Sequence, residues 1–312
     1  MQRIRIIDSH TEGEPTRVVI EGGPDLGPGS AAERLEVFRR EHDGFRTAVV
    51  LEPRGAESLV GALLGAPSSA EAVAEVIFFN NVGYLGMCVH GTIGVARTLL
   101  HLGRIGYGRH RLETPAGTVA FTVSDSGAVA VENVFSYRHA AGVSVATERY
   151  GEVSGDVAYG GNWFFLLEEN GERVDPEDLE ALTEFAWDVR RAFTAQGLTG
   201  AGGAEIDHVE VLLPPRRPEA DARSFVLCPG KAFDRSPCGT GLSAEMACLA
   251  ATGRLAGGRI WRQESAIGSL FEGSVEIVEG GVLPTVRGRA YVTSEATLLV
   301  EPEDPFPRGL AA

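Results

Sequence analysis

Short apolar runs, many of them alternating with polar residues, recur along the chain and predict a protein rich in strands. The strands expected in the first half are residues 3–7, 16–20, 45–51 and 72–80, with hairpins between residues 111 and 137. Those expected in the second half are residues 160–167, 207–213 and 224–228, with hairpins between residues 260 and 302.

Four stretches have the spacing or the boundary signals of helices instead. They are residues 31–41, the residues after Cys88, residues 175–196 and residues 242–252. Many strands and a few helices, arranged as two successive copies of one mixture, indicate an α+β fold.

The two copies are marked by a repeat around Cys88 and Cys238, which lie 150 residues apart. A glycine stands 15 residues after each cysteine. The residues that match at this offset are Gly91 with Gly241, Leu99 with Leu249, Gly103 with Gly253 and Arg104 with Arg254. Because a helix start, its end and the following residues recur together, the sequence predicts two homologous halves.

Each cysteine is expected at the N-terminus of a helix, with Pro237 at the first helical position of the second one. Backbone N–H groups and the positive end of a helix stabilise a thiolate, and they also bind carboxylates. Two equivalent thiols suggest that Cys88 and Cys238 remove a proton from one face of a carbon and deliver one to the other. Such a reaction inverts a stereocentre without a cofactor.

The halves are expected to form two domains. The first comprises residues 1–137 and is joined by the tail, residues 296–312. The second comprises residues 138–295. A length of 312 residues and a mass of 33.1 kDa suit two domains that each bury a core.

The net charge and the cysteine content indicate which binding partners and which cellular compartment to expect. The formal net charge is −15 and the pI is about 5.0, which disfavours nucleic acid and anionic membrane as partners. The absence of a membrane-length apolar run or a signal-peptide core favours a cytoplasmic protein. No C-x-x-C pair, phosphate-binding glycine motif or serine-hydrolase elbow occurs, so neither a metal nor a nucleotide is expected.

Three further polar residues are candidates for the site, and each has a structural alternative. His90 follows Cys88 by two residues and either contacts the ligand or bonds nearby backbone. Asp234 precedes Cys238 by four residues and either pairs with a substrate ammonium or caps a turn. His208 lies within an alternating strand and either lines a pocket or belongs to the polar face of that strand.

Two motifs resemble those of the proline racemase family, Met87–Gly94 and Asp234–Gly241, and the N-terminal stretch Ile7–Val19 resembles the family's N-terminus. The resemblance covers nearly the whole chain and is strongest to members that epimerise 4-hydroxyproline at C2. It implies the diaminopimelate-epimerase-like fold, with two pseudo-symmetric α+β domains and an active site in the cleft between them.

The resemblance also implies roles for particular residues. Cys88 and Cys238 are implied to be the acid–base pair that interconverts trans-4-hydroxy-L-proline and cis-4-hydroxy-D-proline. The residues implied to bind the substrate are Val89, His90, His208, Asp234, Gly239 and Thr240. The family uses no metal, pyridoxal phosphate or nucleotide. Its partner is a small molecule, hydroxyproline or proline, and a homodimer is left open.

Val89 departs from the family, which usually has glycine at this position. A branched side chain there narrows the pocket or shifts the backbone, which bears on substrate preference more than on chemistry. Proline racemase therefore stays an alternative. A second alternative is dehydration of trans-3-hydroxyproline, but enzymes of that kind usually lack a cysteine at the position of Cys88. A third alternative is a non-catalytic thiol redox or amino-acid-binding protein.

Overall fold

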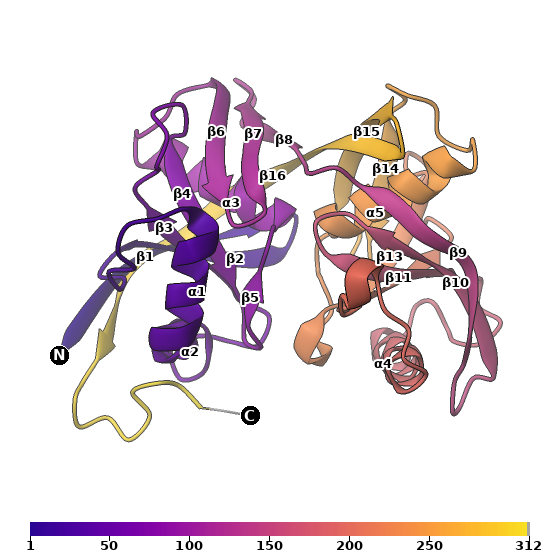
Figure 1. The fold of residues 1–312 in the computed structure, drawn as a ribbon, viewed down its shortest axis with the longest axis horizontal. Helices are drawn as coiled ribbons and strands as arrows, with labels where there is room; N and C mark the ends of the chain where they lie inside the picture. The colour runs from indigo at the N-terminus through magenta and orange to yellow at the C-terminus, as the bar shows by residue number, and fades with distance from the viewer. Residues whose placement is uncertain (311–312) are drawn as a thin grey trace. The chain divides into compact units, whose positions relative to one another are not determined.

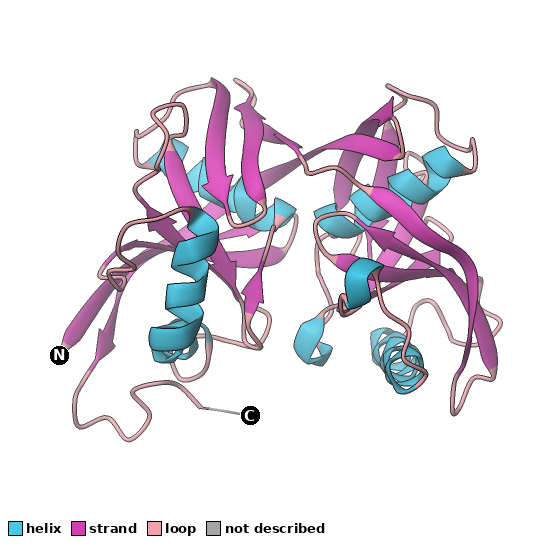
Figure 2. Cartoon of the chain, in the orientation of Figure 1, coloured by secondary structure: helices cyan, strands magenta, loops and turns pink. Residues whose placement is uncertain are grey.

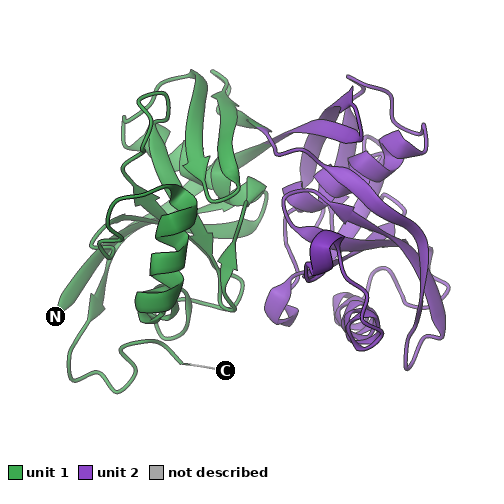
Figure 3. Ribbon diagram, in the orientation of Figure 1, with its two compact units in different colours: residues 1–131, 288–312 green, residues 132–287 purple. Residues whose placement is uncertain are grey.

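The computed structural model describes residues 1–310 and divides into two compact units (Figure 1, Figure 3). Unit 1 contains residues 1–131 and the chain from residue 288 onward, and unit 2 contains residues 132–287. The chain passes from unit 1 to unit 2 after residue 131, and it returns to unit 1 within one long strand, β16 (Gly281–Val300). The sequence expectation put the two boundaries at residues 137/138 and 295/296.

Unit 1 is a ring of strands around a buried helix. Its strands are β1 (Gln2–Thr11), β2 (Glu14–Glu21), β3 (Val60–Gly65), β4 (Ala74–Phe79), β5 (Tyr84–Leu85), β6 (Gly108–Thr114), β7 (Gly117–Val123), β8 (Ala128–Glu132) and the later part of β16. Its helices are α1 (Ala31–Glu41), α2 (Asp43–Val50) and α3 (Val89–His101). The strand order is β1-β2-β3-β4-β6-β7-β8-β16, and β16 also pairs with β1, which closes the ring.

Unit 2 is built from the same kinds of element (Figure 2). Its strands are β9 (Tyr137–Ala146), β10 (Glu152–Tyr159), β11 (Trp163–Glu168), β12 (His208–Leu213), β13 (Ala222–Leu227), β14 (Trp261–Ser265), β15 (Leu270–Val278) and the first part of β16. Its α-helices are α4 (Leu179–Ala195) and α5 (Gly239–Ala251), and short 3₁₀ turns occupy Ala201–Gly203 and Pro229–Lys231.

Strand pairing follows the same succession in both units. From β1 to β7 the pairs are antiparallel, parallel, antiparallel, parallel and antiparallel. From β10 to β15 the pairs have the same five directions in the same order. The second parallel connection carries α3 in unit 1 and α5 in unit 2, so the helix that follows each cysteine has the same place in its sheet.

Helices α3 and α5 match in length, burial and termination. Each has 13 residues, of which 10 are buried. Each ends at a glycine with positive φ, Gly103 at 67° and Gly253 at 73°. The next residue closes the end through a backbone bond of 2.9 Å, from Arg104 to Leu99 O and from Arg254 to Leu249 O. This αL termination confirms the helix stop predicted from the repeated glycines.

The remaining helices are amphipathic covers on the sheets. Ser30 and Glu33 form a capping box at the start of α1, which buries Leu35 and Phe38 against the core of unit 1. The Asp178 side chain caps α4, whose apolar face packs on the core of unit 2. Burial of these faces against the sheets supplies the main stabilisation of both units.

The prediction of a strand at residues 45–51 is wrong, because this stretch belongs to α2 and begins the loop after it. The apolar run Ala48-Val49-Val50 suits either type of element, and burial of Val49 and Val50 against the unit 1 core decides in favour of a helix. Strands β1 and β2 also extend further than predicted, leaving only Glu12 and Gly13 as the turn. Strand β3 was not predicted.

Within residues 1–310, no helix is long and apolar enough to cross a membrane. The same residues hold no group of three or more His, Cys, Asp or Glu side chains arranged to bind a metal ion. None of the four cysteines, all of which fall in this range, forms a disulfide.

Candidate active site

In unit 1 the predicted residues Cys88, Val89 and His90 lie together at the start of α3. Cys88 is the N-cap residue, and its sulfur accepts a hydrogen bond of 3.3 Å from the backbone N–H of Gly91. His90 Nδ1 lies 3.4 Å from the same sulfur. A backbone N–H that donates to the sulfur and an imidazole nitrogen next to it suit a thiol that exchanges a proton.

Neighbouring side chains hold the backbone of this turn. The Thr11 hydroxyl, at the end of β1, donates to the His90 carbonyl at 2.9 Å. The Thr92 hydroxyl donates to the Cys88 carbonyl at 2.8 Å. Val89 is the first residue of α3 and is 1% exposed, so its side chain lies in the interior of unit 1. The sequence did not single out Thr11 or Thr92, whose hydroxyls serve the backbone rather than the sulfur.

In unit 2 the predicted residues Cys238, Gly239 and Thr240 lie at the start of α5. Cys238 is the N-cap residue with φ at 53°, a left-handed conformation that is strained for a side chain other than glycine. The prediction that Pro237 occupies the first helical position is wrong, since α5 begins at Gly239. The proline instead precedes the strained residue and restricts the approach of the chain to it.

Asp234 fixes the loop that leads to Cys238. Its Oδ1 accepts bonds from both the N–H and the hydroxyl of Ser236, each at 2.8 Å. The Ser236 Oγ in turn accepts from the Cys238 N–H at 3.3 Å. Asp234 is 4% exposed, so a buried carboxylate supports the backbone of the cysteine. These contacts give the turn-capping role considered for Asp234 from sequence.

Asn162 is a polar residue of this region that sequence reasoning missed. Its Nδ2 donates to the Thr240 hydroxyl at 3.2 Å, and that hydroxyl lies 3.7 Å from the Cys238 sulfur. The backbone of α5 comes close to Gly160 here, since a Cβ on Gly160 would lie 2.1 Å from the Thr240 carbonyl oxygen. The glycine pair that precedes Asn162 was the available signal for such a close approach.

His208 begins β12 and packs against the apolar cluster that includes Cys238. Its Nδ1 lies 2.7 Å from Asp207 Oδ1, and its ring stacks on Phe164 with the centroids 4.7 Å apart. Phe164 and Cys238 belong to one buried apolar cluster. His208 is 5% exposed, so it is an interior residue rather than part of a polar strand face.

The pKa of Cys238 is raised well above the usual value for a thiol. Burial is the main cause, and electrostatic interactions with Asp234, Cys228 and Glu210 act in the same direction. The backbone N–H of Gly241 has the opposite effect on the pKa but is outweighed. The stabilisation of a thiolate that a helix end is expected to give is therefore opposed at Cys238 by burial and by its neighbours.

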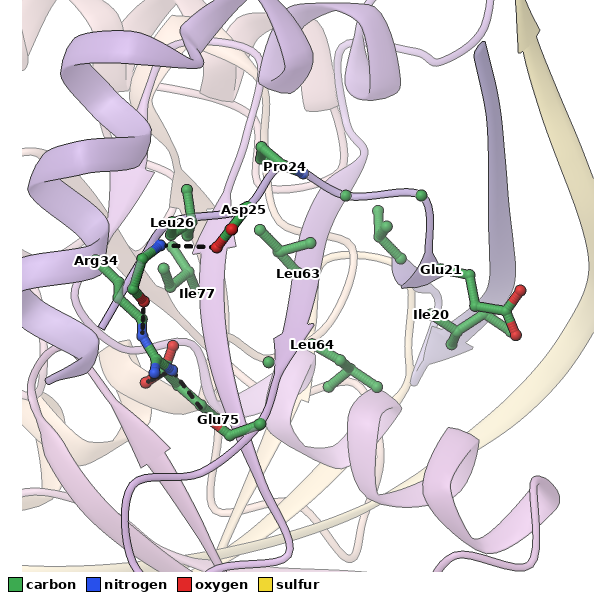
Figure 4. A pocket seen from close by; sticks show the side chains of 16 residues that line it. Ile20, Glu21, Pro24, Asp25, Leu26, Arg34, Leu63, Leu64, Glu75 and Ile77 are labelled. Carbon is green, nitrogen blue, oxygen red and sulfur yellow. Dashed lines mark hydrogen bonds and ion pairs between the residues drawn. The ribbon is translucent and has the colours of Figure 1, made fainter. Parts of the chain in front are cut away.

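Two cavities lie apart from these residues. One, of about 360 Å³, lies in unit 1 between the end of β2, the loop after it, β3 and α1, where Arg34 bonds to Glu75 (Figure 4). The other, of about 280 Å³, lies in unit 2 beside α5 and is lined by Glu245 and Cys248 among others. No predicted site residue lines either cavity.

Comparison with known proteins matches the whole chain. The family described as proline racemase matches residues 6–311. A 4-hydroxyproline 2-epimerase of Burkholderia cenocepacia is 58% identical over 312 residues, which is 100% of both chains. A 4-hydroxyproline epimerase of Burkholderia pseudomallei is 59% identical, again over 100% of both chains.

Solved structures agree with this result. A hydroxyproline epimerase from Agrobacterium vitis, with bound trans-4-hydroxy-L-proline, matches with a TM-score of 0.88 and 27% identity, covering 100% of this chain and 96% of that one. A phenazine biosynthesis protein of the PhzF family from Bacillus anthracis matches with a TM-score of 0.64 and 16% identity, covering 96% of this chain and 100% of that one. The second match shows a shared fold alone.

Proposed function

The chain belongs to the proline racemase family, and we propose that it is a 4-hydroxyproline 2-epimerase, an isomerase that interconverts trans-4-hydroxy-L-proline and cis-4-hydroxy-D-proline. The names of curated relatives at 58% and 59% identity over the whole chain support the substrate. The ligand in the Agrobacterium vitis structure, trans-4-hydroxy-L-proline, supports the same choice.

The observation that carries the chemistry is the pair of cysteines at equivalent N-caps. Cys88 and Cys238 precede helices of equal length that follow the same strand in each unit. Two like residues in like places suit a reaction whose two half-steps are the same proton transfer on opposite faces of one carbon.

We propose the following proton balance. A thiolate at one cysteine takes the α-proton of the bound imino acid, and the carbon is left with the electron pair of the broken C–H bond. The thiol of the other cysteine donates its proton to the opposite face, which forms a new C–H bond and inverts the centre. The two cysteines exchange the roles of base and acid between the two directions of the reaction, so each serves one face of the α-carbon.

The substrate is expected to use the groups that surround each sulfur. We propose that Val89, His90, His208, Asp234, Gly239 and Thr240 contribute to its binding. Backbone N–H groups in the first turns of α3 and α5 are suited to the substrate carboxylate. Asp234 bears a buried negative charge that is suited to attract the substrate ammonium, although its Oδ1 already accepts from Ser236.

We propose further that the units act as the two pseudo-symmetric domains of a diaminopimelate-epimerase-like fold, and that one substrate in a cleft between them meets both thiols. The repeated pairing order and the matched helices α3 and α5 support this arrangement. The cytoplasmic location and the homodimer considered from sequence stay parts of the proposal.

A change in optical rotation, with the product then identified by chiral chromatography, tests the proposed function directly. The purified protein, with no cofactor added, is incubated with trans-4-hydroxy-L-proline, and the product is identified by chiral chromatography. We expect cis-4-hydroxy-D-proline to accumulate until the two epimers reach equilibrium, starting from either one. Conversion of proline alone would favour the racemase alternative, and conversion of neither substrate would refute an isomerase of these imino acids.

A further inference from the structure

Asn133 is a buried polar residue in the segment between β8 and β9, and sequence reasoning did not single it out. It is 6% exposed, and its backbone N–H donates to the carbonyl of Pro284 on β16 at 2.8 Å. Its side-chain Nδ2 donates to the carbonyl of Gly160 at 2.8 Å and to the hydroxyl of Ser243 on α5 at 2.9 Å. The two N–H groups of one amide therefore join the turn at Gly160 to the helix that follows Cys238.

The orientation of the amide follows from its partners. A backbone carbonyl only accepts hydrogen bonds, so the atom that faces Gly160 has to be Nδ2. The Ser243 hydroxyl donates its single proton to the carbonyl of Gly239 at 2.7 Å, which leaves it to accept from Asn133. Asn133 Oδ1 is buried and has no hydrogen-bond partner in the described part of the chain. The contribution of this side chain therefore comes from its two N–H donors.

One of these hydrogen bonds leads to the backbone next to Cys238. Asn133 donates to Ser243, and Ser243 donates to the carbonyl of Gly239, the residue directly after Cys238. A serine that bonds to the carbonyl four residues before it is an ordinary feature of helices. Here the hydroxyl is also fixed by an amide from outside the helix, so the first turn of α5 is tied to the segment before β9.

The other hydrogen bond leads to the turn at Gly160 and through it to Thr240. This turn lies against α5, since a Cβ on Gly160 would lie 2.1 Å from the Thr240 carbonyl oxygen. The Gly160 N–H donates to the carbonyl of Asn162 at 3.1 Å, and Asn162 Nδ2 donates to the Thr240 hydroxyl at 3.2 Å. Because that hydroxyl lies 3.7 Å from the Cys238 sulfur, the second connection ends beside the thiol.

We propose that Asn133 is a positioning residue for Cys238, which it acts on by joining the turn at Gly160 to the first turn of α5. Through Gly239 and Thr240 the two connections fix the backbone and the hydroxyl that surround the sulfur. The inference rests on the proposed function, in which Cys238 exchanges a proton in every turnover. Asn133 acts through the turn that presents the sulfur and does not contact the substrate in this account.

Two variants and a control test this role. Asn133→Leu removes both donors and keeps a side chain of similar shape, whereas Ser243→Ala removes one connection and leaves Asn133 in place. Asn170→Leu, at an exposed asparagine, is the matched control. The rate at which iodoacetamide alkylates Cys238 is measured by peptide mass spectrometry, with Cys88 in the same molecule as the internal reference. This readout does not depend on the protein being an epimerase.

Epimerisation kcat and KM for trans-4-hydroxy-L-proline are measured alongside, and thermal unfolding shows whether each variant folds. We expect Asn133→Leu to change the alkylation rate of Cys238 about fivefold or more and that of Cys88 less than about twofold, because only the α5 turn loses its support. It should lower kcat about tenfold or more with a smaller effect on KM, since the position of the reacting group is what changes.

Ser243→Ala is expected to show the same pattern with smaller changes. In the double variant the loss of kcat should be less than the product of the two single losses, because both residues act through one hydrogen-bond network. A loss equal to that product would show that Asn133 and Ser243 act separately, and would contradict the connection through Ser243.

Other results would overturn the positioning role itself. If Asn133→Leu lowers the melting temperature but leaves Cys238 alkylation and kcat like those of Asn170→Leu, Asn133 supports the fold alone. If Asn133→Leu does not fold, Ser243→Ala decides, and an unchanged Cys238 rate in it refutes the proposal. Should the unaltered protein epimerise neither hydroxyproline nor proline while the alkylation rates follow expectation, the proposed function fails and the positioning of Cys238 by Asn133 stands.

Discussion

The backbone N–H of Gly91 donates to the sulfur of Cys88 at 3.3 Å, and the Cα of the same glycine faces the ring of Phe78. One residue therefore both orients the thiol and lets α3 pack against β4. A side chain at this position would have to displace the ring or the sulfur, which links the geometry of the proposed catalytic residue to the packing of unit 1.

Gly91→Ala tests this link. The added Cβ would lie 2.7 Å from Phe78 Cε1 and 3.0 Å from the Cys88 sulfur. We expect a loss of kcat of about a hundredfold, because a misplacement of the order of 1 Å costs about that much. Gly106→Ala is the matched control, since nothing lies within 4 Å of its Cβ and its φ is not positive. Equal initial rates for both variants would contradict a tight fit around Cys88.

Val89 provides a test of specificity. Its buried branched side chain follows Cys88 directly, and its removal should widen the space next to the sulfur or relax the turn. We expect Val89→Gly to change the ratio of kcat/KM for 4-hydroxyproline and proline by about tenfold, the scale of a small apolar group in a pocket. Val89→Ala should give an intermediate ratio. If the two activities change in parallel, Val89 affects the fold or the chemistry and not the choice of substrate.

Glu245 makes the stability of unit 2 depend on pH. Burial on α5 raises its pKa to about 8, with charges of Glu168 and Asp221 adding to the effect and Arg254 opposing it. A pKa raised by folding means that the unfolded chain loses its proton first as pH rises. The stabilisation that the neutral carboxyl group gives is therefore fully present below pH 4.5, the ordinary pKa of a glutamate. It decreases as the pH rises from there to about 8, the pKa in the folded protein.

We expect Glu245→Gln to remove much of this loss, which has a slope of at most about 1.4 kcal/mol per pH unit for one proton. The free energy of unfolding is measured by urea titration at several pH values between 5 and 8, a range that ends at the Glu245 pKa of about 8. Glu279→Gln, at an exposed glutamate, is the control. A wild-type slope that persists unchanged in Glu245→Gln would assign the pH dependence to other groups.

The sequence was informative where local signals and tertiary packing agree. Residues 31–41 were predicted as a helix from the spacing of Leu35 and Phe38, and α1 has these bounds in the structure, where Ser30 and Glu33 add a capping box. The repeat of Gly103 and Gly253 predicted the ends of α3 and α5, since a positive φ after a helix favours glycine. The two cysteine motifs also predicted that Cys88 and Cys238 lie at helix N-termini, where the structure has them as N-cap residues.

Other features depend on contacts that a sequence does not display. The strained φ of Cys238 is held by Ser236 and by packing, whereas Pro237 alone suggested a helix start two residues too early. Glu210 resembled any polar residue of an alternating strand until its carboxyl group was found beneath Gly241. Such interior polar groups are set by distant elements, so neither periodicity nor composition identifies them.

The two-thiol account predicts opposite defects for the two cysteine variants. Serine keeps the shape but lacks a comparably acidic proton, so either Cys88→Ser or Cys238→Ser should abolish full inversion. The surviving thiol can still exchange the α-proton of the substrate whose face it serves. Each variant should therefore exchange with only one enantiomeric series, and the two variants should prefer opposite series.

The most direct measurement is the loss of the α-proton signal by NMR in deuterated buffer, for both variants with trans-4-hydroxy-L-proline and with cis-4-hydroxy-D-proline. The account predicts no epimerisation in either variant, and any exchange that remains should be confined to opposite substrates in the two. Near wild-type epimerisation by Cys88→Ser would contradict it, and would instead support a single base at Cys238.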